Sequence, residues 1–206
     1  MFKSRQNPST REITESIFIM AHIAELKEWD NRAHLKRIKA YAYTLCTGLD
    51  IPHVEAEIIA LACQLHDIGK STTPEEMLLR NGEYTDLEWR LMEKHTLEGE
   101  ALLRGAAAPV LQMGAQIALT HHERWNGSGY PNRLVGDAVP LSGRVCAVAD
   151  VFDALTTERP YKESIGDQQA LALIQRSSGI LFDQEVVRVF TSKFKEILNI
   201  KNSPSD

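Results

Sequence analysis

Apolar residues recur every three or four positions along almost the whole chain, and strand-like alternation of apolar and polar residues is nearly absent. This spacing predicts helices, and prolines, glycines and capping residues indicate where they begin and end. The expected helices cover 9–29, 31–45, 52–67, 85–95, 109–121, 140–150, 168–177 and 184–199, with a short helical turn at 76–79.

Short signals support several of these helix ends. Thr85 with Glu88 predicts a capping box, and Asp167 and Asp183 are expected as N-caps of the two closing helices. Gly48 is expected to stop the second helix. Without repeats, low-complexity segments or internal linkers, the chain is expected to form one all-α domain. Its expected parts are an N-terminal helix at 1–29, the compact domain at 30–200 and a frayed tail at 201–206.

The composition indicates an ordinary soluble protein. A chain of 206 residues with 43% hydrophobic and 25% charged residues can bury a substantial core. The net charge of −5 argues against DNA as a partner. With no apolar run of membrane-spanning length and no signal peptide pattern, we expect a cytoplasmic protein without membrane insertion. Cys46, Cys63 and Cys146 lie in apolar helical contexts and are expected as reduced core thiols.

The segment His66-Asp67-Ile68-Gly69-Lys70 offers an imidazole, a carboxylate and an ammonium group within five residues. An adjacent histidine and aspartate can give a divalent metal one nitrogen and one oxygen ligand, and Gly69 would form the turn that aims Lys70. Alone, a His-Asp pair is more often a surface feature or a hydrogen-bonded pair.

Further histidines at helix ends change this interpretation. His34, His66, His95, His121 and His122 lie on or beside apolar stripes; in the helix from Thr85, for instance, His95 is expected on the face of Leu87 and Leu91. A buried imidazole without a partner is costly, and a shared metal cluster would satisfy all of them. The alternative, in which each histidine finds its own backbone carbonyl, is the weaker account for five together. His22 and His53 are expected at the surface or at helix ends.

The order and spacing of His34, HDIGK (66–70), His95 in HTLEG, HHERWNGSGYP (121–131) and ADVFDALTTERPYK (149–162) closely resemble the HD-GYP family. The resemblance covers roughly 30–195. It implies a compact multi-helix domain of the HD superfamily. It also implies a bacterial metal-dependent phosphodiesterase that opens cyclic di-GMP to pGpG, and onward to GMP as an open second step, by attack of a metal-bridging hydroxide.

The resemblance also implies which residues do this chemistry. Asp67 would bridge two metals and act in catalysis with Lys70, which would stabilise charge on the phosphate or assist the leaving oxygen. Asp30 would either hold a third metal or N-cap the second helix. The implied metal ligands are His34, His66, Asp67, His95, His121, His122 and Asp150. Iron or manganese is expected ahead of zinc, nickel or magnesium.

Four residues are implied in substrate binding. Tyr130 of the GYP motif would contact the ligand, and Arg159 and Lys162 would hold its phosphates or guanine. Asp153 would accept from a guanine edge or orient a metal ligand; as a plain alternative it pairs with a nearby base on the helix surface.

The chain departs from the family pattern in three places: Ser71-Thr72-Thr73 replaces small apolar residues, Asn126 stands where aspartate is frequent, and WDNRA (29–33) puts the third metal in doubt. Two alternative functions stay open: a catalytically weak cyclic di-GMP receptor or docking module, and a phosphohydrolase of another cyclic dinucleotide such as cyclic GMP-AMP. Expected partners are a sensor or receiver domain, a diguanylate cyclase domain docking at the GYP loop (126–132), or a second copy packed on the first helix.

Overall fold

The computed structural model describes residues 10–26, 31–80, 82–158 and 164–203. Over these ranges the regular structure is helical, accompanied by two isolated β-bridges. The all-α prediction is therefore confirmed. The α-helices are α1 (Thr10–Glu25), α2 (Arg32–Gly48), α3 (His53–Cys63), α4 (Glu75–Leu78), α5 (Asp86–Leu103), α6 (Pro109–Thr120), α7 (Leu141–Thr156), α8 (Asp167–Arg176), α9 (Gln184–Ser192) and α10 (Phe194–Lys201). Two 3-10 helices are η1 (Ile68–Thr72) and η2 (Gly136–Ala138).

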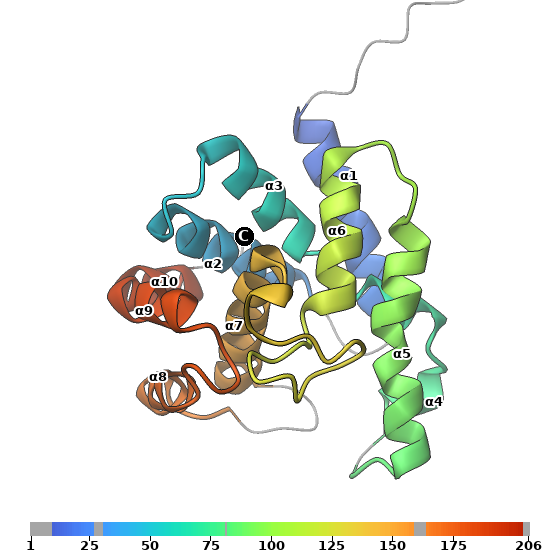
Figure 1. Ribbon diagram of the computed structural model, residues 1–206. Coiled ribbons are helices and arrows are strands. Elements are labelled where there is room, and N and C mark those ends of the chain that lie inside the picture. The colour runs from blue at the N-terminus through green and yellow to red at the C-terminus, as the bar shows by residue number, and fades with distance from the viewer. Residues whose placement is uncertain (1–9, 27–30, 81, 159–163, 204–206) are drawn as a thin grey trace, which may run out of the picture.

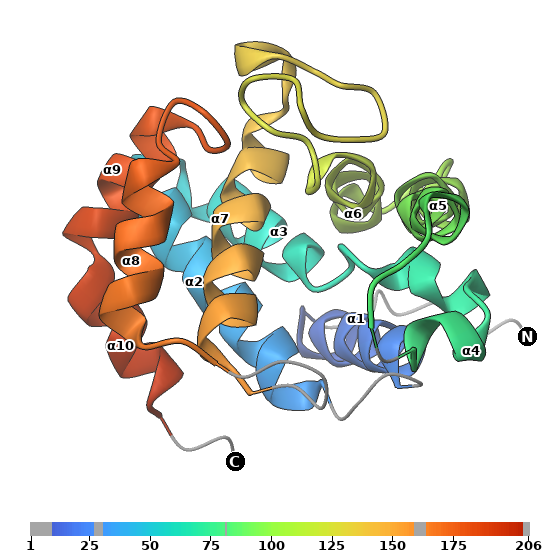
Figure 2. The same ribbon diagram turned by 90° about the horizontal axis from the view of Figure 1, so that it is seen from below.

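Helices α2, α3, α6 and α7 pack against one another in the middle of the molecule. Figures 1 and 2 show α5 beside α6 on one side, and α8, α9 and α10 beyond α7 on the other. Phe152 connects α7 with both α2 and α9. The centroid of its ring lies 5.6 Å from that of Tyr41 in α2 and 5.2 Å from that of Phe190 in α9. Each such buried aromatic side chain contributes about 1.5–3 kcal/mol of transfer free energy.

Helix α1 packs against η1, α2 and α3. Its buried residues Ile17, Ala21 and Ala24 belong to the same apolar core as α2 and α7. Among the described residues, no helix combines the length and apolar character needed to cross a bilayer. Cys46, Cys63 and Cys146 are buried and form no disulfide, as expected.

The third helix is shorter than predicted. It ends at Cys63, and His66 and Asp67 lie in the tight turn before η1 rather than in the helix. Gly69 explains this local structure. A Cβ atom at Gly69 would overlap the backbone of His95 and Gly99 in α5, so the glycine allows η1 to lie directly on α5.

The predicted apolar face of α5 is wrong over its first turns. Leu87 is 68% exposed, whereas His95 is 2% exposed. The buried residues of α5 all lie in its second half, which packs against α6 and η1. A helical stripe predicts which residues share a face, but not how much of that face a neighbouring helix covers.

The closing helices also differ from the prediction. The expected helix 184–199 is divided at Lys193 into α9 and α10. Asp167 is the first residue of α8, and Gly166 is its N-cap. The Asp167 carboxylate instead pairs with Lys201. Lys201 is the last residue of α10 and therefore is no part of a frayed tail. Gly48 is likewise the last residue of α2 and not the residue after it. The capping box at Thr85 and the Asp183 N-cap are confirmed.

Candidate metal centre

Histidines and aspartates from distant parts of the chain meet in two neighbouring groups. Within each group, one ligand atom per residue lies within 4.8 Å of the others. The first group consists of Asp67, His95, His121 and His122, and the second of His34, His66 and Asp150. The seven residues implied as metal ligands thus lie in these two groups, whereas Asp30 lies outside the described residues.

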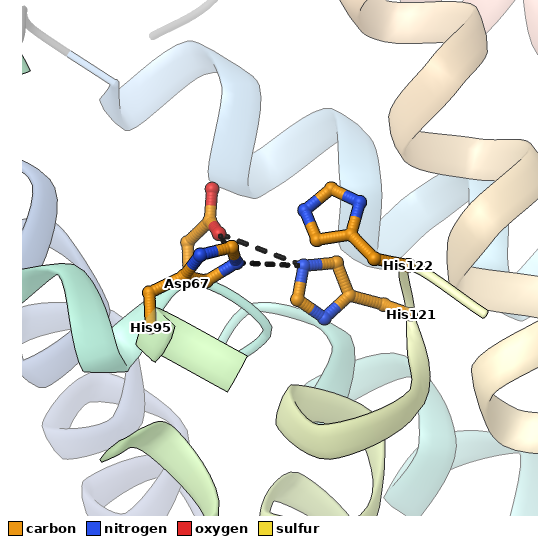
Figure 3. A group of neighbouring side chains, drawn as sticks. All are labelled: Asp67, His95, His121 and His122. Carbon is orange, nitrogen blue, oxygen red and sulfur yellow. Dashed lines mark hydrogen bonds and ion pairs between the residues drawn. The ribbon is translucent and has the colours of Figure 1, made fainter. Parts of the chain in front are cut away.

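Five parts of the fold supply these side chains. Helix α2 carries His34, the turn after α3 carries His66 and Asp67, α5 carries His95, the end of α6 carries His121 and His122, and α7 carries Asp150. Figure 3 shows the first group, with His121 facing Asp67 and His95 from the end of α6.

The Asp67 carboxylate lies between the two groups. Its Oδ1 atom is 3.3 Å from His95 Nε2 and 3.6 Å from His121 Nε2, both in the first group. Its Oδ2 atom is 3.3 Å from His66 Nε2 in the second group and 2.8 Å from Lys70 Nζ. One oxygen faces each group, so the carboxylate can offer one ligand atom to each.

Backbone carbonyls orient three of the imidazoles. The Nδ1 atoms of His66, His95 and His121 lie 2.9, 2.6 and 3.0 Å from the carbonyl oxygens of Cys63, Met92 and Ala118. Since a carbonyl only accepts, Nδ1 donates a hydrogen in each ring, which leaves Nε2 as the nitrogen that can bind a metal. The carbonyl contacts that were weighed against a metal cluster are present, and they aim the free nitrogens at Asp67.

A carboxylate orients His34 in the same way. Asp153 Oδ2 lies 2.8 Å from His34 Nδ1, and Arg37 donates to both Asp153 oxygens at 2.6 and 2.9 Å. Burial alone would raise the pKa of Asp153, but the hydrogen bonds from Arg37 and His34 outweigh it and hold the pKa well below its usual value. Of the roles weighed for Asp153, this geometry favours orienting a metal ligand; the paired base is Arg37, and the pair is not at the helix surface.

The side chains present fit a divalent metal cluster. His66 Nε2 and Asp67 Oδ1 are buried and have no hydrogen-bond partner among the described residues. Leaving such atoms unpaired costs about 1–3 kcal/mol each, and a metal ion would supply the missing partner. Burial lowers the pKa of His66, but the Asp67 and Asp150 carboxylates more than offset this and raise it to about 10. The site therefore attracts a cation, either a proton or a metal.

The GYP loop lies over the first group. The Tyr130 ring stacks on His122 with centroids 4.7 Å apart. Glu123 fixes the loop, because its carboxylate accepts from the backbone N–H groups of Asn132 at 2.7 Å and Leu134 at 3.0 Å. Asn126 replaces aspartate without loss of the turn, since its Oδ1 accepts from Ser128 N at 3.0 Å.

The structure describes the catalytic candidate Lys70 and two of the four residues implied in substrate binding. The Lys70 side chain lies in η1 beside Asp67 and is 14% exposed. Tyr130 adjoins the metal ligands, and Asp153 lies behind His34. Arg159 and Lys162 lie outside the described residues.

Sequence reasoning missed Glu25, Arg37 and Glu123. Glu25 is a buried carboxylate of α1, and its Oε1 atom has no hydrogen-bond partner among the described residues. Burial raises the pKa of Glu25, and the nearby Asp67 carboxylate raises it further. One signal was present: Glu25 follows Ala21 by four residues on the buried face of α1, where a charged residue is unexpected.

Fold and site together define a helical domain built around a pocket whose histidine and aspartate groups fit divalent metals. The model of the HD domain family matches residues 18–186, so this chain belongs to the HD domain family. The comparisons below confirm the resemblance to HD-GYP proteins.

Curated relatives are similar over most of this chain. A cyclic di-GMP phosphodiesterase of Thermotoga maritima is 38% identical over 192 residues, which cover 93% of this chain and 52% of the relative. The cyclic di-GMP phosphodiesterase response regulator RpfG of Xanthomonas campestris is 42% identical over 173 residues, covering 84% and 46%. A 3'3'-cGAMP-specific phosphodiesterase 2 of Vibrio cholerae is 36% identical over 192 residues, covering 93% and 37%. The chain thus spans about half the length of these relatives, or less.

Solved structures share the fold at low sequence identity. A cyclic GMP-AMP specific phosphodiesterase of Vibrio cholerae matches with a TM-score of 0.65 and 21% identity, covering 93% of this chain and 50% of the other. An HDG"Y"P protein from Bdellovibrio bacteriovorus matches with a TM-score of 0.62 and 18% identity, covering 79% and 51%.

Proposed function

We propose that this chain is a metal-dependent phosphodiesterase that hydrolyses cyclic di-GMP to pGpG, with GMP as the product of a second cleavage. One observation carries the proposal: the Asp67 carboxylate faces two groups of histidines that five parts of the fold bring together. The names of the curated relatives supply the substrate, since several are called cyclic di-GMP phosphodiesterases.

In this proposal each group would hold one divalent metal, and Asp67 would contribute a ligand to both. When bound, the metals supply a nucleophile at neutral pH and neutralise the charge of the phosphodiester. Nitrogen and oxygen ligands suit iron and manganese, the metals that the family resemblance favours, although the ligand types alone do not separate these two. A third metal would take Asp30 as a ligand, and the departure from the family pattern at WDNRA (29–33) argues against it.

The chain's own residues bind and orient the substrate. The Lys70 ammonium lies beside the shared carboxylate, where its charge can stabilise the negative charge that develops on the phosphate or the leaving oxygen. Asp153 fixes the imidazole of His34, and Tyr130 borders the pocket over His122. Arg159 and Lys162 would hold the ligand's phosphates or guanine.

Cyclic GMP-AMP is the second candidate substrate, because three curated relatives from Vibrio cholerae are named as 3'3'-cGAMP-specific phosphodiesterases.

We also propose a cytoplasmic location and a regulatory partner. The side chains of Ile19, Ile23 and Leu26 are exposed at α1, where a sensor domain or a second copy of the chain would pack.

The test uses the full chain purified anaerobically. Its metal content is measured, the protein is incubated with cyclic di-GMP or 3'3'-cGAMP, and the products are separated by chromatography. We expect pGpG to form first from cyclic di-GMP, followed by GMP. Preferential cleavage of 3'3'-cGAMP would show that this dinucleotide, and not cyclic di-GMP, is the substrate. Full metal loading without product from either dinucleotide would indicate a receptor.

A further inference from the structure

A cleft separates the first half of α5 from the GYP loop. Its volume is about 630 Å³, within the roughly 300–1,000 Å³ typical of sites for small molecules. It adjoins the metal centre, because His122 and Tyr130 line the cleft and His122 also belongs to the first ligand group. A ligand in the cleft can therefore extend from a phosphate held at the metal centre.

The charge of the cleft is opposite to that of the chain. Four cations line it, and Glu93 is the single carboxylate among its described lining residues. The whole chain carries a net charge of −5, so this local excess of positive charge marks a site for an anion. The four cations are Arg90, Lys94, Arg124 and Arg133.

Arg124 is the most deeply placed of these cations. Its Nη1 atom is buried and has no hydrogen-bond partner among the described residues, while its guanidinium lies 5.5 Å from the centroid of the Phe182 ring. A buried guanidinium nitrogen without a partner is costly, and a phosphate oxygen would supply the missing acceptor.

Each wall of the cleft also carries an aromatic ring, Trp89 on α5 and Tyr130 on the GYP loop. Trp89 is 46% exposed, and its ring meets Tyr130 edge to face with centroids 6.1 Å apart. A half-exposed indole next to cations is a stacking surface for a nucleobase.

We infer that this cleft is a nucleotide subsite, in which a purine base stacks on Trp89 and a phosphate pairs with Lys94 and Arg124. It would hold the half of the cyclic dinucleotide that extends beyond the metal centre on the side of His122. The inference rests on the proposed function for the identity of the ligand. It deepens that function by assigning α5 residues to substrate affinity.

The test compares four variants of the full, metal-loaded chain with wild type: Trp89→Ala, Trp89→Phe, Lys94→Ala and the control Lys195→Ala. Lys195 is exposed on α10, so the control removes the same charge far from the cleft. Two quantities are measured: KM and kcat for cyclic di-GMP, and the affinity for GMP by calorimetry. Because GMP contains no diester bond, its binding is independent of turnover. Metal content and melting temperature are recorded for every variant.

We expect Trp89→Ala and Lys94→Ala each to raise KM and weaken GMP binding about tenfold, the scale of one lost base stack or phosphate contact, with kcat within about twofold. Trp89→Phe keeps a stacking ring, so its KM and GMP affinity should stay within about threefold of the wild-type values. Lys195→Ala should have the wild-type KM and GMP affinity. Unchanged KM and GMP affinity in both alanine variants would overturn the subsite. So would an equal loss in Trp89→Phe and Trp89→Ala, or losses explained by lower metal content. If wild type cleaves no cyclic dinucleotide, the proposed function fails, and the GMP affinities still decide the subsite.

Discussion

At the scale of single residues, the metal centre depends on the groups that hydrogen-bond to its histidines and fix the orientation of each ring. Backbone carbonyls fix His66, His95 and His121 through Nδ1, and Asp153 fixes His34. These contacts determine which ring nitrogen is free, and so they prepare the site before a metal arrives. The contribution of each ligand to metal affinity therefore depends on the group that orients it.

Asp153→Asn tests this orientation. The amide keeps the shape of the side chain but removes the charge that pairs with Arg37 and His34, so we expect metal affinity to fall about 10- to 100-fold. We also expect the unfolding free energy to fall by about 3 kcal/mol, because the partly buried guanidinium loses its negatively charged partner. Metal titration and thermal unfolding measure the two effects. A variant with normal metal affinity and only a raised KM would show instead that Asp153 contacts the substrate.

The pH dependence of metal binding follows from His66. With a pKa of about 10 in the metal-free protein, His66 is protonated at neutral pH, and a metal must displace that proton. Metal affinity should therefore rise with pH, by up to about tenfold per unit below the pKa of His66. Calorimetry at one pH in two buffers of different ionisation enthalpy counts the released protons. Binding without proton release would contradict the assignment of His66 as a ligand that is protonated in the metal-free state.

At the scale of elements, tight packing between η1 and α5 brings Asp67 and His95 together. Gly69 is the contact point, since any side chain there would meet the α5 backbone. Two constraints therefore act on the HDIGK motif. His66, Asp67 and Lys70 are needed for the proposed chemistry, and position 69 must be glycine because η1 lies directly on the α5 backbone.

Gly69→Ala is expected to be destabilising. The new methyl group must push η1 away from α5, at a cost of about 1–3 kcal/mol or more, which lowers the melting temperature by several degrees. Gly166→Ala is the control for the added methyl group, because its Cβ would meet nothing closer than Gln169 Oε1 at 3.9 Å, and the loss of a glycine N-cap there should cost less than about 1 kcal/mol. Thermal unfolding of both variants decides the point, and equal melting temperatures would show that the η1–α5 contact adapts at no cost.

The elements also show what a sequence can and cannot predict. Helical periodicity and local caps such as Thr85 and Asp183 predicted most helices, because these signals act within a few residues. The breaks after Cys63 and at Lys193 carry no local glycine or proline signal and depend on neighbouring elements. Likewise, the spacing from Ala21 places Glu25 on the buried face of α1, but only the packing of α1 brings Glu25 to the site.

At the scale of the whole molecule, the domain encloses carboxylates that need cations. Glu25, Asp67 and Asp153 are buried, and Asp153 is matched by Arg37, whereas Glu25 Oε1 and Asp67 Oδ1 have no hydrogen-bond partner within the described chain. Metal binding and folding stability are therefore coupled.

Metal removal should lower the melting temperature. A metal present at about 100 times its dissociation constant adds about 2.7 kcal/mol, or roughly 5–10 °C for a chain of this size. Differential scanning calorimetry with and without a chelator measures the shift. Asp67→Asn is the control, since it removes the shared ligand and should lose most of the shift. A chelator that leaves the wild-type melting temperature unchanged would show that no metal supports the fold.

Anomalous X-ray diffraction from crystals of the metal-loaded protein tests the central claim most directly. We predict two strong metal peaks on either side of Asp67, one among His95, His121 and His122 and the other among His34, His66 and Asp150. A crystal of metal-saturated protein with no peak next to Asp67, or with its metals bound elsewhere, would contradict the account.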